Sequence, residues 1–254
     1  MRRSIGIAIG SIMLLVAILA IWQFVSEQRL ISPVFFPPPS RVAAALYNQV
    51  VTGSIWFPLA MTCLRMFSGW LLAVFVGLSL GALIGLSRQA SDYFEPSLEF
   101  LRTLPASAVL PIFIMLMGLT DVMVVSVIAF GSLWPVLLGS LHGFRSTEPR
   151  LLEVSRNLEL NKHAVLTKIT FPNATPDILA GARISIGFAL ILAVVAEMLS
   201  SLPGLGNNVL LASRSFRSAD LYAGIIVLGI VGATSTGVIN AMERRLLRWR
   251  PELA

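Results

Sequence analysis

Six apolar segments, each long enough to cross a lipid bilayer, constrain the fold of this chain more than any other feature. They run over residues 4–26, 64–86, 97–119, 121–142, 177–199 and 220–242. A membrane-spanning helix needs about 20 apolar residues to cross a hydrocarbon core roughly 30 Å thick. Of the 254 residues, 56% are hydrophobic and only 13% are charged, against about 25% charged in an ordinary soluble domain. The sequence therefore predicts an all-α, polytopic membrane protein with six transmembrane helices.

The first apolar segment could be a cleaved signal peptide or a retained helix. Ser26-Glu27-Gln28 is a poor cleavage site and the apolar run is long, so we favour a retained helix. The residues after it include Pro37-Pro38-Pro39, a run that cannot continue a helix. We therefore divide the chain into residues 1–57, an N-terminal helix with an extracytoplasmic segment, and residues 58–254, the core.

The distribution of Lys and Arg predicts the orientation in the membrane. If the N-terminus is cytoplasmic and the six spans alternate, cytoplasmic segments hold twelve basic residues and outside segments hold four. The other three, Arg65, Arg102 and Arg183, lie near span ends, where a long side chain can reach the interface. This bias places both termini and residues 143–176 in the cytoplasm. The net charge of +6 then needs no nucleic-acid partner to explain it.

Small residues recur at every fourth position in three of the spans, and such stripes let another helix backbone approach closely. They predict either packing within one subunit or a surface that lines a pore or a dimer interface. In the third span, Pro105 and Pro111 each remove a helical donor and should kink or break the helix. The stripes are Gly69, Ala73, Gly77, Gly81 and Gly85; Gly181, Ser185, Ala189 and Ala193; and Gly229, Ala233, Gly237 and Ala241.

Glu197 is the most informative acid inside a span. It follows Ala193 by four residues and continues the small-residue face of the fifth span, so we expect it to face protein rather than lipid. Near the outer end of the span, it could act as a solvated or hydrogen-bonded cap or belong to a gate. Gly204 and Gly206, just after the span, allow a tight backbone turn. No second ionisable partner is evident deep in the membrane, which argues against a proton-coupled transporter.

No catalytic or metal-binding motif accompanies the spans. The phosphate-loop, nucleophile-elbow and zinc patterns are missing, and His142 and His163 lack the spacing of metal ligands. We therefore expect no enzymatic activity, cofactor or metal on this chain. An ion-coupled secondary transporter and a membrane-embedded enzyme are the alternatives. The sequence favours neither, because midplane acids and convergent polar side chains are missing from the spans.

The charged connection over residues 143–176 predicts a helix–turn–helix between the fourth and fifth spans. Its first helix has one apolar and one charged face. Asn161 is a suitable N-cap for a second short helix, which we expect Pro172 to end. The acidic residues suit a protein partner better than an anionic lipid surface. The apolar face comprises Leu151, Val154 and Leu158, and the charged face comprises Glu153, Arg156 and Glu159.

At this connection the chain resembles the binding-protein-dependent permeases of ATP-binding-cassette (ABC) importers. Their signature is Glu-Ala-Ala, three residues, Gly, nine residues and then Ile-x-Leu-Pro. Here Glu153-Val154-Ser155 takes the first place, and Ile169-Thr170-Phe171-Pro172 closes the motif at the expected spacing. Glu159 stands where the family has glycine, and a turn that suits glycine costs another residue about 1–2 kcal/mol. The substitution of glutamate for glycine at position 159 should therefore affect the geometry of this turn.

The resemblance extends over nearly the whole chain and is most similar to the nitrate, sulfonate and taurine branch. It implies a type I ABC importer permease fold in the bacterial inner membrane. The segments that carry it are Phe100-Leu101-Arg102-Thr103-Leu104-Pro105 with Leu110-Pro111, Ala196-Glu197-Met198 with Gly204-Leu205-Gly206, and Pro33, Pro37 to Pro39 and Arg41.

The function that the resemblance implies is translocation of a small polar solute, such as a sulfonate, nitrate or another small anion, delivered by an extracytoplasmic solute-binding protein. The working unit would contain two permease subunits, expected as a homodimer, and two ATPase subunits that carry ATP and magnesium. The loop that couples to the ATPase would act through Glu153, Val154, Ser155, Leu158, Glu159, Ile169 and Pro172. A gate or translocation path would include Pro105, Pro111, Glu197, Gly204 and Gly206.

Overall fold

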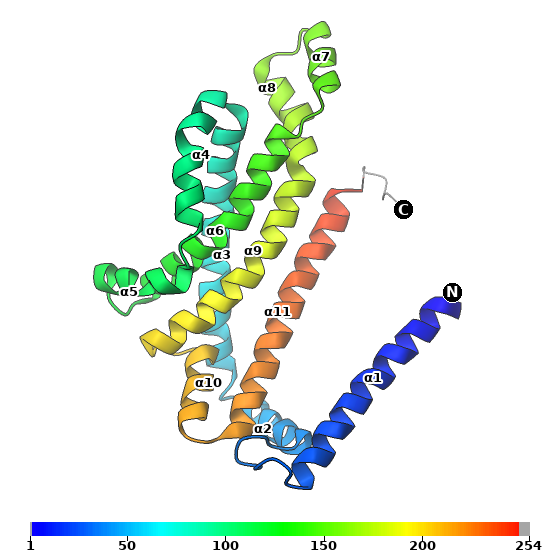
Figure 1. Cartoon of the computed structure of the whole chain (residues 1–254), viewed down its shortest axis with the longest axis vertical. Coiled ribbons are helices and arrows are strands. Elements are labelled where there is room, and N and C mark those ends of the chain that lie inside the picture. Colours follow the sequence, from blue (N-terminus) through cyan, green and yellow to red (C-terminus); the bar gives the residue numbers. More distant parts are fainter. Residues whose placement is uncertain (1, 249–254) are drawn as a thin grey trace.

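The structure, a computed structural model, describes the backbone of residues 2–248 and the side chains of residues 10, 11 and 13–248. Over this part the chain is a bundle of α-helices without strands (Figure 1). In chain order the elements are α1 (Arg2–Glu27), α2 (Pro39–Val51), α3 (Trp56–Leu86), α4 (Arg88–Arg102), α5 (Ala106–Met117), α6 (Asp121–Arg145), α7 (Pro149–Asn157), α8 (Lys162–Val165), the π-helical turn η1 (Leu166–Thr170), α9 (Phe171–Ser200), α10 (Leu205–Arg214) and α11 (Ser218–Leu246).

The core of the bundle is formed by α3, α6 and α9, with α6 between the other two. Two of the small-residue stripes lie in these contacts. A Cβ atom added at Gly69 of α3 would lie 2.6 Å from the Cβ of Ile128. One added at Gly181 of α9 would overlap the carbonyl oxygen of Pro135. Only glycine permits such an approach, so these two stripes pack helices within one subunit.

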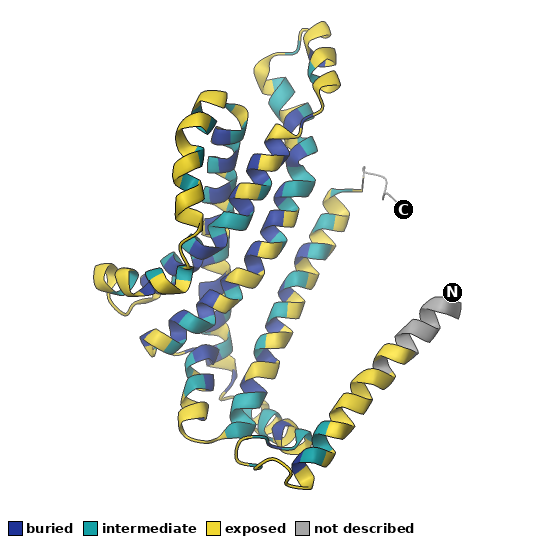
Figure 2. Ribbon diagram, in the orientation of Figure 1, coloured by how far each residue is buried: buried dark blue, intermediate teal, exposed yellow. Residues whose placement is uncertain are grey.

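The third stripe, on α11, is open instead. Its four small residues, 229, 233, 237 and 241, are exposed, and Figure 2 shows exposed positions along the length of this helix. A Cβ atom added at Gly229 or Gly237 would meet no atom within 4 Å. The neighbouring helix α1 diverges from the bundle and contacts it near its own C-terminal end, where Trp22 Nε1 donates to the Pro37 carbonyl at 3.1 Å. The α11 stripe is therefore available to another helix.

The membrane-spanning character of the chain follows from the lengths of these helices. By length and composition, α3, α6, the helical run Lys162–Ser200 and α11 can each cross a membrane. The pair α4–α5 passes the same test when taken together, which gives up to five spans. Over the first predicted span, α1 is helical, and its segment Met13–Glu27 is apolar. The prediction of an all-α polytopic membrane protein is confirmed for the described residues.

The third predicted span, residues 97–119, is broken rather than continuous. Its two parts, α4 and α5, are bent by 95° at residues 103–105. Pro105 occupies the N-cap of α5 with an extended backbone (ψ 120°). Its ring disfavours a helical conformation of the preceding residue and it has no N–H to donate, so α4 cannot continue through it. Pro111 lies inside α5 without ending it. The expected break is thus confirmed at Pro105, whereas Pro111 does not break its helix.

The bundle has two different ends, which we name by their short helices (Figure 1). At the α7 end, the hairpin of α7 and α8 extends beyond the core helices. At the α10 end, α2 and α10 both pack against α11. Within the predicted N-terminal unit, residues 1–57, α2 therefore lies against α11 of the core.

Candidate functional site

Glu197 lies at the centre of a buried polar network toward the α10 end. Its side chain is fully buried, so the prediction that it faces protein is confirmed. Thr62 Oγ1 of α3 donates to the carboxylate at 3.0 Å from Oε1 and 2.9 Å from Oε2. Arg65 Nη1, also on α3, donates to Oε1 at 2.9 Å. The carboxylate therefore joins α9 to α3 through a hydrogen-bonded ion pair.

The same carboxylate caps a third helix. The N–H of Gly206 donates to Glu197 Oε2 at 3.0 Å, and the N–H of Leu205 donates to Thr62 Oγ1 at 2.9 Å. These are the first two N–H groups of α10, which have no partner inside their own helix. A negative charge at a helix N-terminus is favourable, and here it comes from another helix. Glu197 thus fixes where α10 begins relative to α3 and α9.

Arg65 is the residue of this network that the sequence interpretation placed wrongly. We expected it to reach the membrane interface, but its residue is only 4% exposed. Its Nε donates to Asp121 Oδ1 of α6 at 2.7 Å, and its Nη1 donates to the Pro203 carbonyl at 2.7 Å. The reason is that α3 begins at Trp56, so Arg65 lies well inside the helix and faces α9. A buried guanidinium needs such partners because its desolvation is costly.

Gly204 and Gly206 both lie against this network, and at each position a neighbouring group lies too close to leave room for a side chain. A Cβ atom at Gly204 would overlap the carboxyl group of Glu197, and one at Gly206 would lie 2.5 Å from the Val194 carbonyl oxygen. Glycine therefore lets the chain between α9 and α10 fold tightly over Glu197. The structure thus brings together three of the five predicted gate residues. Pro105, the N-cap of α5, and Pro111, inside α5, take part in none of these hydrogen bonds.

Gly204→Ala should destabilise the protein, because the added methyl group would displace the Glu197 carboxylate from α10. We expect a loss of about 1–3 kcal/mol, as for other overpacked sites. Thermal unfolding in detergent can be followed by thiol labelling of Cys63, the single cysteine of the chain. Gly187→Ala is the matched control, since a Cβ atom there meets nothing within 4 Å. Equal unfolding temperatures for Gly204→Ala and wild type would contradict this role.

Pro105 borders a second feature, a large cavity between the α4–α5 break, α6 and α9. Its volume is about 870 Å³, and most of its lining is apolar, from residues such as Leu138, Ile184 and Phe188. Three ionisable side chains, Arg102, His142 and Asp177, line it as well. A cavity of this size can hold a small organic solute.

At the α7 end, the predicted helix–turn–helix is present. α7 ends in a turn in which the N–H of Leu160 donates to the Ser155 carbonyl and the N–H of Glu159 donates to the Arg156 carbonyl, each at 3.0 Å. Glu159 has φ +51°, the left-handed conformation that favours glycine at this position. Glu159 therefore adopts, without being glycine, a backbone conformation that glycine reaches at lower cost.

The residues predicted to form the coupling loop divide into an exposed and a packed set. Leu151, Val154 and Leu158 are 41%, 51% and 65% exposed, so the apolar face of α7 is uncovered by the described chain. Glu153 and Glu159 are exposed too, whereas Ser155 is buried and bonds the Leu152 carbonyl. An exposed apolar stripe on a short helix marks an interaction surface.

The second helix of the hairpin differs from the prediction. Asn161 is its N-cap as expected, and its side chain accepts from the N–H of Ala164 at 2.8 Å. Pro172, however, does not end it: the chain stays helical from Lys162 to Ser200. The π-helical turn η1 precedes the proline, and the N–H of Phe171 bonds the Leu166 carbonyl. This wider turn accommodates a proline, which supplies no N–H of its own. Ile169 and Pro172 therefore connect α8 directly to the span α9.

The other two arginines near span ends differ from Arg65. Arg102 is exposed at the end of α4, where it lies 3.5 Å from Glu99. Arg183 of α9 forms an ion pair with Glu243 of α11.

Among the residues whose side chains are described, no group of three or more His, Cys, Asp or Glu could hold a metal ion.

Fold and site together define an all-α membrane protein with a buried polar network toward one end and an exposed amphipathic helix at the other. The chain belongs to the binding-protein-dependent transport system inner membrane components, whose family model matches residues 73–249. It is therefore a permease subunit of an ABC importer, which confirms the resemblance found in its sequence.

Individual relatives agree with this family. The chain is 34% identical to the aliphatic sulfonates transport permease protein SsuC of Bacillus subtilis, over 92% of this chain and 84% of that protein. It is 28% identical to the taurine transport system permease protein TauC of Escherichia coli, over 100% of this chain and 93% of that protein. A crystal structure of an amino acid ABC transporter shares the fold, with a TM-score of 0.61 and 19% identity over 80% of this chain and 97% of that chain.

Proposed function

We propose that this subunit takes its energy from a separate ATPase that docks on the apolar face of α7. The observation that carries the proposal is the exposure of Val154 and Leu158 on a helix with the spacing of the family's coupling loop. Contacts of this kind, in which a short amphipathic helix lies in a groove of its partner, are common in protein recognition. ATP and magnesium would be held by that ATPase.

The working unit that we propose contains two copies of this permease and two ATPase subunits. The open stripe of α11 supports a helix-packing surface for a further helix, because small residues let backbones approach closely in membranes. A homodimer would place two such bundles around one shared pathway.

We propose a small anion as the solute, because the relatives' names specify aliphatic sulfonates and taurine. The cavity at the α4–α5 break supports a pathway for such a solute, since its mostly apolar lining carries the basic side chains of Arg102 and His142 against the single acid Asp177. A solute-binding protein would deliver the solute, and alternating access would follow from rocking of the bundles as the ATPase closes. The energy then enters through contacts at α7, and no bond of the solute is broken.

Co-purification tests the proposed assembly. The tagged chain, expressed with its cognate ATPase, should elute as a complex of both proteins, and the bound ATPase should hydrolyse ATP faster when the loaded solute-binding protein is added. Elution of the permease without the ATPase, under conditions in which both are expressed and stable, would contradict the proposal.

The proposed topology places both termini and the α7 end in the cytoplasm of a bacterial inner membrane and the α10 end outside. The twelve-to-four distribution of basic residues supports it. In a Cys63→Ser background, an impermeant thiol reagent applied to intact cells should label Arg41→Cys and leave Arg156→Cys unlabelled. Both positions are exposed in the structure, so access to the reagent depends on the side of the membrane. Labelling of Arg156→Cys in intact cells would reverse the orientation.

A further inference from the structure

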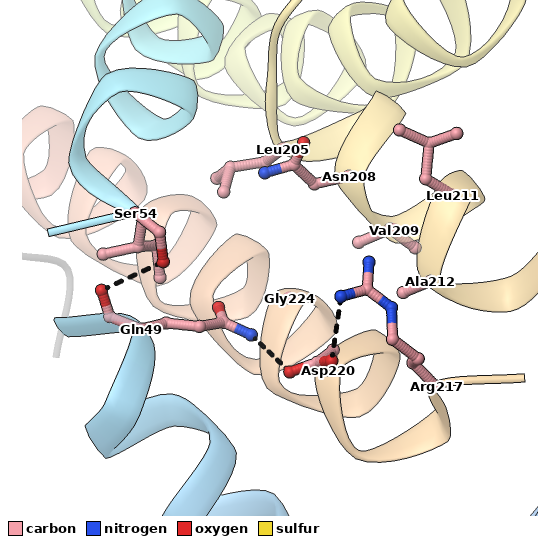
Figure 3. A pocket seen from close by; sticks show the side chains of 11 residues that line it. Gln49, Ser54, Leu205, Asn208, Val209, Leu211, Ala212, Arg217, Asp220 and Gly224 are labelled. Atoms are coloured by element: carbon pink, nitrogen blue, oxygen red, sulfur yellow. Dashed lines mark hydrogen bonds and ion pairs between the residues drawn. The ribbon is translucent and has the colours of Figure 1, made fainter. Parts of the chain in front are cut away.

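A small polar pocket lies at the α10 end, apart from the large cavity and from the apolar face of α7. It is bounded by α2, α10 and α11 and has a volume of about 220 Å³ (Figure 3). Sites for whole small molecules usually measure about 300–1,000 Å³. The pocket is therefore better suited to one or two side chains of a partner than to a complete solute.

The polar groups of the pocket are arranged around Asp220. Gln49 Nε2 donates to Asp220 Oδ1 at 2.9 Å, and Arg217 Nη1 lies 3.6 Å from Asp220 Oδ2. Figure 3 shows Gln49 and Arg217 approaching this carboxylate from opposite sides. The Arg217 side chain is 62% exposed, against 32% for Asp220. Arg217 therefore has guanidinium N–H groups that can donate to a second carboxylate. Its ion pair with Asp220 is long and exposed, so this pair holds the guanidinium only weakly in place.

The charge around the pocket favours an acidic partner. Residues 27–57 and 201–220, the two longer connections at this end, contain four arginines and two acids. The short turn before α6 adds Asp121, whose carboxylate accepts a hydrogen bond from the buried Arg65. One of the two acids, Asp220, already has Gln49 and Arg217 as partners. Opposite charge on a partner surface speeds encounter and selects the correct docking orientation.

The pocket also shares a helix with the Glu197 network. Leu205, Asn208 and Val209 of α10 line it, and the N–H of Leu205 is a member of that network. At the contact of α10 with α11, a Cβ atom added at Gly224 would lie 2.6 Å from Val209 Cγ2, so the two helices touch closely. A side chain that enters the pocket therefore contacts the helix whose N-terminus Glu197 caps.

We propose that this pocket receives an acidic side chain of the solute-binding protein, held by Arg217, and that its entry is transmitted through α10 to the Glu197 network. This inference rests on the proposed function, because it needs the α10 end to lie outside and a solute-binding protein to dock there. It assigns Arg217 as the anchor for that partner and α10 as the element that links docking to the interior.

The test uses the complex of permease and ATPase in lipid nanodiscs and titrates it with the purified, solute-loaded binding protein. The readout is the concentration of binding protein that gives half-maximal stimulation of ATP hydrolysis, normalised to each variant's own maximum. Arg217→Gln should raise this concentration about tenfold, as loss of a charged anchor at an interface commonly does. Arg217→Lys should recover part of the loss, since it restores the charge without the guanidinium fork.

Arg214→Gln is the matched control, because Arg214 is an exposed arginine of the same segment that does not line the pocket. It should leave the half-maximal concentration within about twofold of wild type. An unchanged value for Arg217→Gln, or equal shifts for Arg214→Gln and Arg217→Gln, would overturn the assignment of Arg217. If the binding protein failed to stimulate even the wild-type complex, the proposed function itself would fail, so the two failures are distinguishable.

Discussion

Replacing Arg65 with methionine should destabilise the protein by about 3–5 kcal/mol, because it would leave the fully buried Glu197 without its charged partner. The loss should appear as a lower unfolding temperature in detergent, followed by labelling of Cys63. Most of this loss of stability comes from leaving a buried carboxylate without a charged partner, and less of it from the strength of the ion pair itself.

The double variant Arg65→Met/Glu197→Leu separates these two contributions. With both charges removed, no unpaired ion stays buried, so the double variant should be more stable than Arg65→Met alone. A double variant as unstable as Arg65→Met, or an Arg65→Met variant as stable as wild type, would contradict the network described here.

Glu197→Gln tests whether this network also acts during transport. The amide keeps the size of the side chain and one oxygen acceptor, so assembly should stay intact while the ion pair with Arg65 is lost. Altered uptake or altered stimulation of the ATPase would place Glu197 in a gate. Wild-type values for both would leave it as the structural cap of α10.

The second large effect is expected at α7. Leu158→Asp would bury a carboxylate in an apolar contact with the ATPase, and Glu153→Lys would reverse a charge at that contact. Each should weaken ATPase binding by more than about 1 kcal/mol and uncouple hydrolysis from uptake. Both side chains are exposed in the isolated subunit, so membrane insertion and its own fold should be unaffected.

The measurement is ATPase pull-down together with solute-stimulated hydrolysis, for all variants in one lipid preparation. Glu159→Gly is the control, since it places glycine where φ is +51°. It should relax the turn after α7 by about 1–2 kcal/mol without harming coupling. Full coupling in both Glu153→Lys and Leu158→Asp would show that α7 does not dock the ATPase.

Hydrophobic periodicity predicted most of the helices of the bundle. The four-residue spacing of the small residues could also have found more of the buried network at the α10 end. Arg65 precedes Gly69 by four residues, as Glu197 follows Ala193 by four, so each charge continues a small-residue face. The rule placed Glu197 correctly in the interior. Arg65 was assigned to the interface because the span was taken to begin at residue 64, whereas α3 begins at Trp56.

Other features depend on tertiary structure and had no local signal. Thr62 and Asp121 are unremarkable in the sequence, and their roles arise when α3 meets α9 and α6. Pro172 follows a sound local rule for ending a helix, yet the π-helical turn before it keeps the helix continuous. Glu159 was expected on the charged face of the first helix, but α7 ends at Asn157 and Glu159 lies in the turn that follows, with φ +51°. The glycine position of the motif was the signal for this left-handed turn.

Reconstitution in liposomes tests the central claim most directly. The permease should be assembled with its ATPase, with ATP supplied on the ATPase side and the solute-loaded binding protein on the other. We expect solute to accumulate on the ATPase side only when the ATPase, ATP and the binding protein are all present. Accumulation by the permease alone, driven by an ion gradient without ATPase or ATP, would contradict the account and identify a secondary transporter instead.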